Sequence, residues 1–300
     1  MADLIGVLAP DEGYTLSALD DVKFLRANGP LPRTPVLYEP CIIVVCKGRK
    51  RGFFADREYV YDAQHYLVLS LPLAFESQTE ASPEEPMLAI SIRVDLAVLA
   101  DLAMQVRAPS SDADAMGINS TPMDDRLGDA VVRLLEALVS PEETTVLAPS
   151  VIREIYYRVL SGAHSAALRA PLAHQSSFGR IGKALRLIHA RYHEPLSVET
   201  LADAAAMSVA AFHAGFKSVT GTSPLQYIKA TRLHKARMLM IQGGQNAALA
   251  ASNVGYESAS QFSREFKRFF GRSPVEEARF MKEAMALRAR VEIPSAQARN

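Results

Sequence analysis

The stretch NVGYESASQFSREFKRFFGRSP, residues 253–274, decides the fold of the C-terminal part of this chain. Its pattern predicts a turn and then a short basic helix that ends at Gly271 and is stopped by Pro274. Phe262 and Phe266 share one face of this helix because they are four residues apart, and the opposite face is polar and basic. Such a helix is either an ordinary exposed helix or the part of the protein that contacts its target.

An internal repeat with an offset of fifty residues contains this stretch. The segment FHAGFK, residues 212–217, is matched by FSREFK, residues 262–267. The segment GTSP, residues 221–224, is matched by GRSP, residues 271–274. Two matches at one offset indicate a duplicated unit and not a longer array, because only two copies exist.

Each copy has the pattern of a helix-turn-helix. A helix rich in small residues comes first, LADAAA at 201–206 in one copy and NAALAASNVG at 246–255 in the other. Small residues allow the second helix to cross the first closely. Ser208 and Ser258 can cap the N-termini of the two second helices. The sequence therefore predicts two helix-turn-helix units.

In the second copy, the second helix carries side chains suited to reading DNA. Such a helix lies in the major groove, where its exposed positions meet base edges. Arg264 suits bidentate recognition of guanine and Gln261 that of adenine, whereas Lys267 and Arg268 suit phosphate contacts. The alternative is an exposed helix with routine charges. The face expected to point outward consists of Ser260, Gln261, Arg264 and Arg268.

The equivalent helix of the first copy offers fewer polar groups. Its outward positions are Ala210, His213, Ala214 and Lys217. Only His213 and Lys217 can donate hydrogen bonds, while the alanines can contact thymine methyl groups. Gly215 in mid-helix costs about 1 kcal/mol relative to alanine. We expect this copy to specify less sequence than the second, and for His213 a purely structural role is the alternative.

The charge of the chain is divided unevenly between its two parts. The formal net charge is zero, but residues 176–300 contain 18 Lys and Arg against 9 Asp and Glu, whereas residues 1–175 contain 15 against 24. A basic domain fits a polyanionic partner, and nucleic acid is the first candidate. The alternative is a solvated charged face without a partner.

A helix predicted at 224–240, PLQYIKATRLHKARMLM, connects the two copies. At about 1.5 Å per residue it spans about 26 Å, and the two reading helices add width at its ends. Successive turns of the major groove lie about 34 Å apart, so one chain can read two successive turns of DNA. The core face expected for this helix consists of Leu225, Ile228, Leu233 and Ala236.

The first part of the chain predicts an antiparallel β unit. From Thr34 to about Asp95, short runs rich in Val, Ile, Tyr and Leu alternate with polar turns. This pattern is typical of strands that close into a barrel or a sandwich.

Two amphipathic helices follow the β unit, at 125–139 and 146–162. They either cover an open face of the β unit or pair two subunits. The segment 163–177 is small, polar and contains proline, which indicates a linker. The predicted domains are therefore residues 1–162 and 178–300. The apolar face of the first helix consists of Leu127, Val131, Leu134, Leu135 and Leu138.

Residues 178–285 resemble the DNA-binding domain of AraC/XylS-type transcription regulators. The resemblance rests on residues 196–240 and 253–279, which have the order and spacing of that family's motifs, including RLHKA on the connecting helix. Two departures are the alanine-rich first reading helix and the EEAR that replaces an aromatic-Arg pair after the final proline. The resemblance places at the DNA surface Ala210, His213, Ala214, Ala259, Ser260, Gln261, Ser263 and Arg264.

The N-terminal part is similar to a cupin-like N-terminal domain of the same family, in residues 32–52, 61–73, 80–95 and 146–162. The resemblance implies an α+β protein, in which a cupin-like antiparallel β-barrel with flanking helices precedes an all-α domain. It also implies an effector-sensing and dimerising role for residues 1–162. The protein would then be a homodimeric transcription activator that binds double-stranded promoter DNA, contacts RNA polymerase and responds to an unknown small molecule.

A cupin-type enzyme with a helical appendage is the alternative from another class. Metal-dependent cupins need two or three histidines and a carboxylate inside the barrel, but His65 is the only histidine in residues 1–162. Hydrolytic triads would depend on the same histidine, and neither GxSxG nor a glycine-rich phosphate loop occurs. We therefore expect no catalytic residue, no metal site and no cofactor.

Cys41 and Cys46 are the only cysteines of the chain. In a buried strand, both are expected to be inert small apolar residues. Alternatively, the basic run KGRKR at 47–51 could lower the pKa of the Cys46 thiol and make it reactive toward oxidants or aldehydes. The same run, with Lys47 and Arg49, could instead bind an anionic effector or form an exposed hairpin. Neither a disulfide scaffold nor a zinc site is indicated.

The chain is expected to stay in the cytoplasm, away from membranes. Residues 1–21 carry acidic side chains where a signal peptide needs basic ones. No apolar run approaches the roughly 18 residues that span a bilayer.

Overall fold

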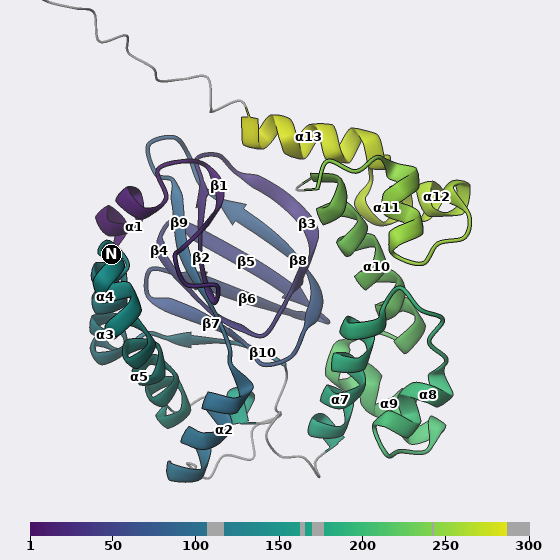
Figure 1. Ribbon diagram of the computed structural model, residues 1–300, viewed down its shortest axis with the longest axis horizontal. Coiled ribbons are helices and arrows are strands. Elements are labelled where there is room, and N and C mark those ends of the chain that lie inside the picture. Colours follow the sequence, from purple (N-terminus) through teal and green to yellow (C-terminus); the bar gives the residue numbers. More distant parts are fainter. Residues whose placement is uncertain (107–116, 163–165, 170–176, 242, 287–300) are drawn as a thin grey trace, which may run out of the picture.

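The computed structural model describes residues 1–106, 117–162, 166–169, 177–241 and 243–286. Figure 1 shows two β-sheets at the centre, with one group of helices on either side. The elements of the N-terminal part are α1 (Ala2–Leu8), β1 (Gly13–Leu16), β2 (Val22–Ala27), β3 (Leu31–Tyr38), β4 (Cys41–Lys47), β5 (Arg49–Phe54), β6 (Arg57–Asp62), β7 (His65–Leu69), β8 (Leu73–Glu80), β9 (Met87–Arg93), α2 (Leu96–Gln105), β10 (Ile118–Pro122), α3 (Asp125–Ala137), α4 (Pro141–Val146), α5 (Ala148–Ser161) and α6 (Ala166–Arg169).

The C-terminal part is helical, and it contains the two predicted helix-turn-helix units. We call α8–α9 the first head and α11–α12 the second head. The helices α9 and α12 begin and end fifty residues apart, as the repeat predicts. The elements are α7 (Ser177–Arg191), α8 (Val198–Ala204), α9 (Val209–Thr220), α10 (Pro224–Ile241), α11 (Ala247–Asn253), α12 (Ala259–Phe270) and α13 (Pro274–Ala286).

The strands form two antiparallel sheets and not a closed barrel. The six-stranded sheet has the order β1-β2-β9-β4-β7-β10, and the four-stranded sheet has the order β3-β8-β5-β6. No backbone pairing joins the two sheets among the described strands. The predicted α+β class is thus confirmed, but the prediction of a closed barrel is wrong.

Gly48 lies at the sharp turn where the chain passes from β4 in one sheet into β5 in the other. The pairing of β4 with β9 shifts register between Val45 and Lys47. Gly48 follows with a φ of 76°, and a Cβ atom at this position would lie 2.8 Å from the Cα atom of Met87. Only glycine fits this close approach and this backbone conformation. The chain therefore turns sharply from β4 in one sheet into β5 in the other.

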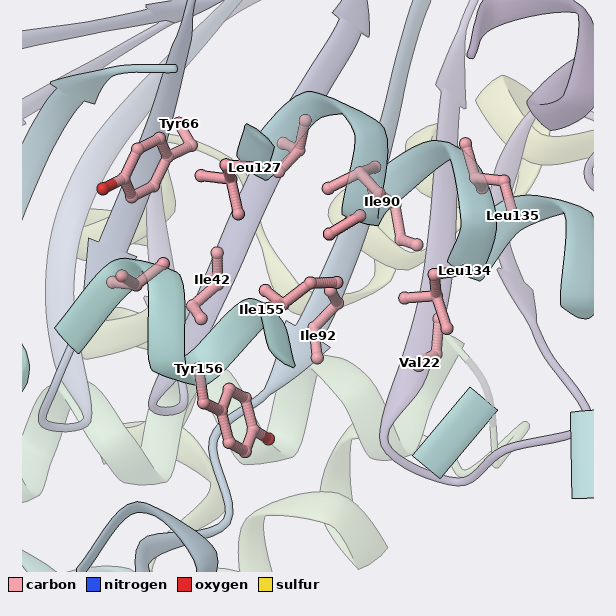
Figure 2. Close-up of a cluster of buried hydrophobic side chains, with 14 of the residues drawn as sticks. Val22, Ile42, Tyr66, Ile90, Ile92, Leu127, Leu134, Leu135, Ile155 and Tyr156 are labelled. Atoms are coloured by element: carbon pink, nitrogen blue, oxygen red, sulfur yellow. The ribbon is translucent and has the colours of Figure 1, made fainter. Parts of the chain in front are cut away.

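Two apolar cores lie on the two faces of the six-stranded sheet. Alternation along β4 directs Ile42 and Val44 to the outer core, against α3 and α5, and Ile43 and Val45 to the inner core between the sheets. The Tyr156 hydroxyl at the outer core donates a hydrogen bond to the Arg93 carbonyl (2.5 Å). Figure 2 shows side chains of the outer core, among them Val22, Ile42, Tyr66, Ile90, Ile92, Leu127, Leu134, Leu135, Ile155 and Tyr156.

The helix pair predicted after the β unit covers the six-stranded sheet (Figure 1). The second predicted helix, 146–162, corresponds to α5, which begins at Ala148. Val146 is instead the last residue of the short helix α4, and Leu147 lies between the two helices. The part of the chain that the structure describes contains no helix long and apolar enough to cross a membrane. All five residues predicted for the apolar face of the first helix are buried: Leu127, Val131, Leu134, Leu135 and Leu138.

The predicted linker, residues 163–177, includes the short helix α6 at 166–169. Leu168 of α6 is buried in the outer core, so this turn of helix belongs with the N-terminal domain. Residues 163–165 and 170–176 of the predicted linker lie outside the described residues.

The connecting helix α10 is buried on more sides than expected. Ile228, Leu233 and Ala236 of the predicted core face are buried, but Leu225 is 58% exposed. Polar residues elsewhere around the helix are buried instead, including Thr231 and His234. The predicted position of Leu225 is therefore wrong, because α10 is packed between both heads and the N-terminal domain and has no single apolar stripe.

Candidate nucleic-acid interface

A row of aromatic side chains fixes the orientation of α12. Phe262, Phe266 and Phe270 are buried in the core of the second head, with ring centroids 5.4 and 4.5 Å apart. The Ser258 hydroxyl caps the helix by accepting a hydrogen bond from the Gln261 amide (3.2 Å). Gly271 ends the helix in the left-handed conformation. The opposite face of α12 is therefore held outward.

The residues predicted to contact DNA from α12 lie on this outward face. Ser263 is half-buried, and its hydroxyl donates to the Ala259 carbonyl within the helix (2.9 Å). No ion pair within the described part of the chain engages Arg264 or Arg268, so both guanidinium groups can meet other anions. The exposed members of the predicted set are Ala259, Ser260, Gln261, Arg264, Lys267 and Arg268.

Glu265 occupies the same side of α12 as Gln261, and sequence reasoning missed it. Its carboxylate accepts hydrogen bonds from Gln261 Nε2 (3.3 Å), Tyr256 Oη (2.9 Å) and Lys229 Nζ (3.1 Å). Burial raises the pKa of Glu265, but these donors outweigh burial and hold the pKa below its ordinary value. The i, i+4 spacing of Gln261 and Glu265 was a readable signal, whereas Lys229 comes from α10 and could not be anticipated.

The reading helix of the first head presents a thinner polar surface. The predicted residues Ala210, His213, Ala214 and Lys217 are all exposed, while Phe212 and Phe216 are buried. The first-head side chains are thus presented as predicted, but with fewer hydrogen-bonding groups than α12 has.

Gly215 allows α7 to approach the first head closely. A Cβ atom at Gly215 would lie 3.1 Å from Ser177 Oγ and 3.5 Å from Ile181 Cδ1, both on α7. Alanine would therefore crowd this helix crossing. The mid-helix glycine, unexplained by the sequence, has a packing reason.

The EEAR stretch on α13 contains a glutamate, Glu277, that forms a buried ion pair. Glu277 is the repeat equivalent of Tyr227, and its side chain is 2% exposed. Its carboxylate contacts Arg237 Nη2 of α10 (3.0 Å) and Arg272 Nη1 (3.3 Å). The departure from the family pattern thus replaces an aromatic core residue by a charge that ties α13 to α10.

Both the start and the end of α10 contact the N-terminal domain (Figure 1). The Tyr227 hydroxyl donates to the Pro72 carbonyl (2.7 Å), and His189 Nε2 lies 2.8 Å from the same hydroxyl. Burial, aided by Lys235, lowers the pKa of His189 to about 4, so the ring is neutral and donates its Nε2 proton. Arg237 Nη1 donates to the Pro35 carbonyl (3.4 Å). These contacts hold α10 against the strands β3 and β8 and the turn before β8.

The basic run at 47–51 covers the end of β4, Gly48 and the start of β5, and its charges point in different directions. Arg49 faces Asp62 (3.5 Å), whereas Lys47 Nζ contacts the Glu84 carbonyl (3.4 Å). Lys50 points between the sheets, is 5% exposed and donates to the Tyr38 hydroxyl (3.0 Å). The alternation of a strand could have predicted this inward lysine.

Neither cysteine has the environment of a reactive thiol. Cys41 is buried between the sheets, and Cys46 sits at the register shift of β4 against the outer core. Burial raises the pKa of both thiols to about 12. The alternative, a Cys46 pKa lowered by the basic run, is therefore contradicted, because the thiol is buried and the run leads away into β5. Within the described residues, no group of three or more His, Cys, Asp or Glu is placed to hold a metal ion.

Two family models match the chain in the two parts described above. The model for the "AraC-type transcriptional regulator N-terminus" matches residues 18–167, which is half of the chain. The model for a "Helix-turn-helix domain" matches residues 201–279. The second match includes both heads and the connecting helix α10.

Curated relatives of the chain are transcriptional regulators. AlkR from Acinetobacter baylyi, a transcriptional regulator, is 39% identical over 94 residues, 31% of each chain. The regulator ArgR from Pseudomonas aeruginosa is 30% identical over 153 residues, 50% of this chain and 46% of that protein. This chain thus spans less than half the length of either relative.

The crystal structure of ToxT from Vibrio cholerae strain SCE256, bound to an unsaturated fatty acid, superposes with a TM-score of 0.58. It covers 85% of this chain and 94% of that chain at 14% identity, which shows a shared fold. Together, the two heads, the N-terminal sheets and the matching models show that this chain belongs to the AraC/XylS family of transcription regulators.

Proposed function

We propose that this AraC-family regulator is an effector-responsive transcription activator that recognises promoter DNA chiefly through its second head. The supporting observation is the outward face of α12, where Gln261, Arg264 and Arg268 are exposed side by side. The proposed contact set comprises Ala210, His213, Ala214, Lys217, Ala259, Ser260, Gln261, Ser263, Arg264, Lys267 and Arg268.

The two domains take different roles in this proposal. Residues 1–162 sense the effector and form a homodimer, residues 163–177 link the domains, and residues 178–300 bind DNA and present a surface to RNA polymerase. Catalysis has no part in this function, in keeping with relatives that are described as transcriptional regulators.

Salt dependence tests the role of the second head. The full chain should bind a duplex selected from a random library with an affinity that falls steeply with salt, because each phosphate contact contributes a slope of about −0.9 in log K against log salt. Arg268→Ala should make the slope shallower by about 1 and weaken all sequences alike.

Arg126→Ala provides the matched control, because Arg126 is an exposed arginine on α3 of the other domain. It should leave the slope unchanged. A flat salt response of the unmodified protein, or equal effects of Arg126→Ala and Arg268→Ala, would contradict the proposal.

Lys50 supports an anionic effector. Its side chain is buried, and among the described residues no carboxylate forms an ion pair with it. Burial lowers the pKa of Lys50, because removing the ammonium group from water disfavours its charged form. Tyr14 interacts electrostatically with both Lys50 and Arg237, so this site adjoins the contact between α10 and the N-terminal domain. A carboxylate ligand, as in the fatty-acid complex of ToxT, would supply the missing counter-charge.

Oleate serves as the probe for this effector site. Adding oleate should change the DNA affinity of the full chain, whereas oleyl alcohol, which lacks the carboxylate, should have a much smaller effect. Lys50→Met should abolish the response to oleate, and it should not lower the thermal midpoint, because an unpaired buried charge is replaced by an apolar side chain of similar length.

Lys47→Met is the matched control, because Lys47 is a lysine of the same basic run that does not point between the sheets. It should respond to oleate like the unmodified protein. An oleate response that survives in Lys50→Met would exclude Lys50 as the anion-binding group.

A further inference from the structure

The carboxylate of Glu265 joins α12, the turn before it and the connecting helix α10. Its Oε1 atom accepts hydrogen bonds from Gln261 Nε2 on the same helix (3.3 Å) and from Lys229 Nζ on α10 (3.1 Å). Its Oε2 atom accepts from the Tyr256 hydroxyl in the turn before α12 (2.9 Å). The Glu265 side chain is 22% exposed, so these contacts are partly shielded from water.

We propose that Glu265 is a positioning residue that orients the Gln261 amide for base recognition, and that Tyr256 and Lys229 hold Glu265 in place. The proposal rests on the proposed DNA-reading role of α12. It assigns an effect on sequence specificity to a side chain that faces the protein. In this proposal Glu265 itself contacts neither a phosphate nor a base.

The hydrogen-bonding chemistry of the two side chains fixes the amide orientation. An ionised carboxylate can only accept hydrogen bonds, so it binds the NH2 group of Gln261 and not the amide oxygen. One N–H of Gln261 is then used inward, while the second N–H and the amide oxygen remain for a base edge. This pair is what adenine requires, because its N7 accepts and its N6 donates in the major groove. Holding the side chain beforehand also reduces the conformational freedom lost on binding.

Lys229 makes a carboxylate acceptable on a helix that meets DNA. An uncompensated negative charge on α12 would repel phosphates. The Lys229 ammonium group, 3.1 Å away on another helix, offsets this charge and leaves the hydrogen bond to Gln261 intact. Tyr256 adds rigidity, because its ring packs edge-on against the buried Phe262 with centroids 5.3 Å apart.

The first head provides an internal comparison. At the offset of fifty residues, Gly215 stands in place of Glu265, Ala211 in place of Gln261 and Ala206 in place of Tyr256. The reading amide and the groups that orient it are thus absent together in the first head. This pairing is expected if Glu265 serves Gln261.

The test is Glu265→Ala in the full chain, with binding measured to four duplexes that differ in the base pair whose preference changes in Gln261→Ala. We expect the preference for adenine at this position to fall about tenfold. Affinity for an unrelated duplex should stay the same or rise, because a negative charge has been removed. A purely structural role predicts the opposite pattern, a similar loss on all duplexes, and that result would overturn the proposal.

Two further variants separate the possible failures. Tyr256→Phe keeps the ring and removes one hydrogen bond to Glu265, so it should lower the preference in the same direction by a smaller factor. Glu257→Ala removes an exposed carboxylate from the same turn and reports the effect of charge alone. In the Gln261→Ala background, Glu265→Ala should cause no further loss of preference; an additional loss would contradict the orienting role. If Gln261→Ala changes no base preference, the DNA-reading role of α12 is what fails.

Discussion

Replacing Glu277 by alanine is expected to destabilise the second head by about 3 to 5 kcal/mol, because it leaves a buried guanidinium group without its counter-charge. The Glu277 side chain is 2% exposed and that of Arg237 is 11% exposed, and their charged atoms lie 3.0 Å apart. Hydrogen exchange of the α12 and α13 amides in the intact protein should accelerate about a hundredfold to a few thousandfold. The amides of α9 should keep their protection, because the first head has a separate apolar core.

The control for this experiment is Glu276→Ala on the same helix. Glu276 is exposed and accepts a hydrogen bond from the Ser273 amide at the start of α13 (2.8 Å). Its loss should have a much smaller effect, confined to fraying at the start of α13. Equal acceleration in Glu276→Ala and Glu277→Ala would show that the buried pair has no special role.

Replacing Arg264 by alanine is expected to weaken specific DNA binding by about 1 to 3 kcal/mol and to relax the preference at one base pair. The guanidinium group is exposed on the face of α12 opposite the buried phenylalanines, and no described carboxylate pairs with it. A guanidinium fork can donate to both acceptors of guanine, which alanine cannot replace. Binding of the variant to duplexes with each of the four base pairs at every position would locate the effect.

His213→Ala on the first head is the comparison for this prediction. His213 is exposed on α9 among alanines, so its removal should cost less affinity and should change base preference less than Arg264→Ala. If His213→Ala had the larger effect on preference, the first head would be the main reader and the assigned ranking of the two heads would be reversed.

Much of the C-terminal fold could be predicted because its signals are local. The serine caps, the glycines at helix ends and the phenylalanines four residues apart all act within one turn of helix, and the repeat shows each signal twice. The outward face of α12 follows from the same local rules, so the exposed positions of Gln261 and Arg264 could be predicted.

Features that depend on contacts between distant segments could not be predicted. Leu225 looked like a core residue because one helical face was assumed for α10, but the N-terminal domain covers other faces of this helix. The sharp turn from β4 into β5 depends on the close approach of Gly48 to Met87, thirty-nine residues further along the chain. Glu277 departs from the family pattern, and its ion pair could not be predicted because its partner Arg237 lies forty residues away.

The contacts of α10 with the N-terminal domain have a thermodynamic consequence. Arg237 bonds to the Pro35 carbonyl of β3 and to Glu277 of α13. Tyr227, at the start of α10, packs in the core of the first head and bonds to the Pro72 carbonyl. Binding equilibria that share a mechanical element are linked, and the coupling free energy is the same in both directions. If a small molecule changes the affinity of this protein for DNA by some factor, bound DNA must change the affinity for that small molecule by the same factor. Under the proposed function, bound DNA would thus act on the N-terminal domain as a second ligand.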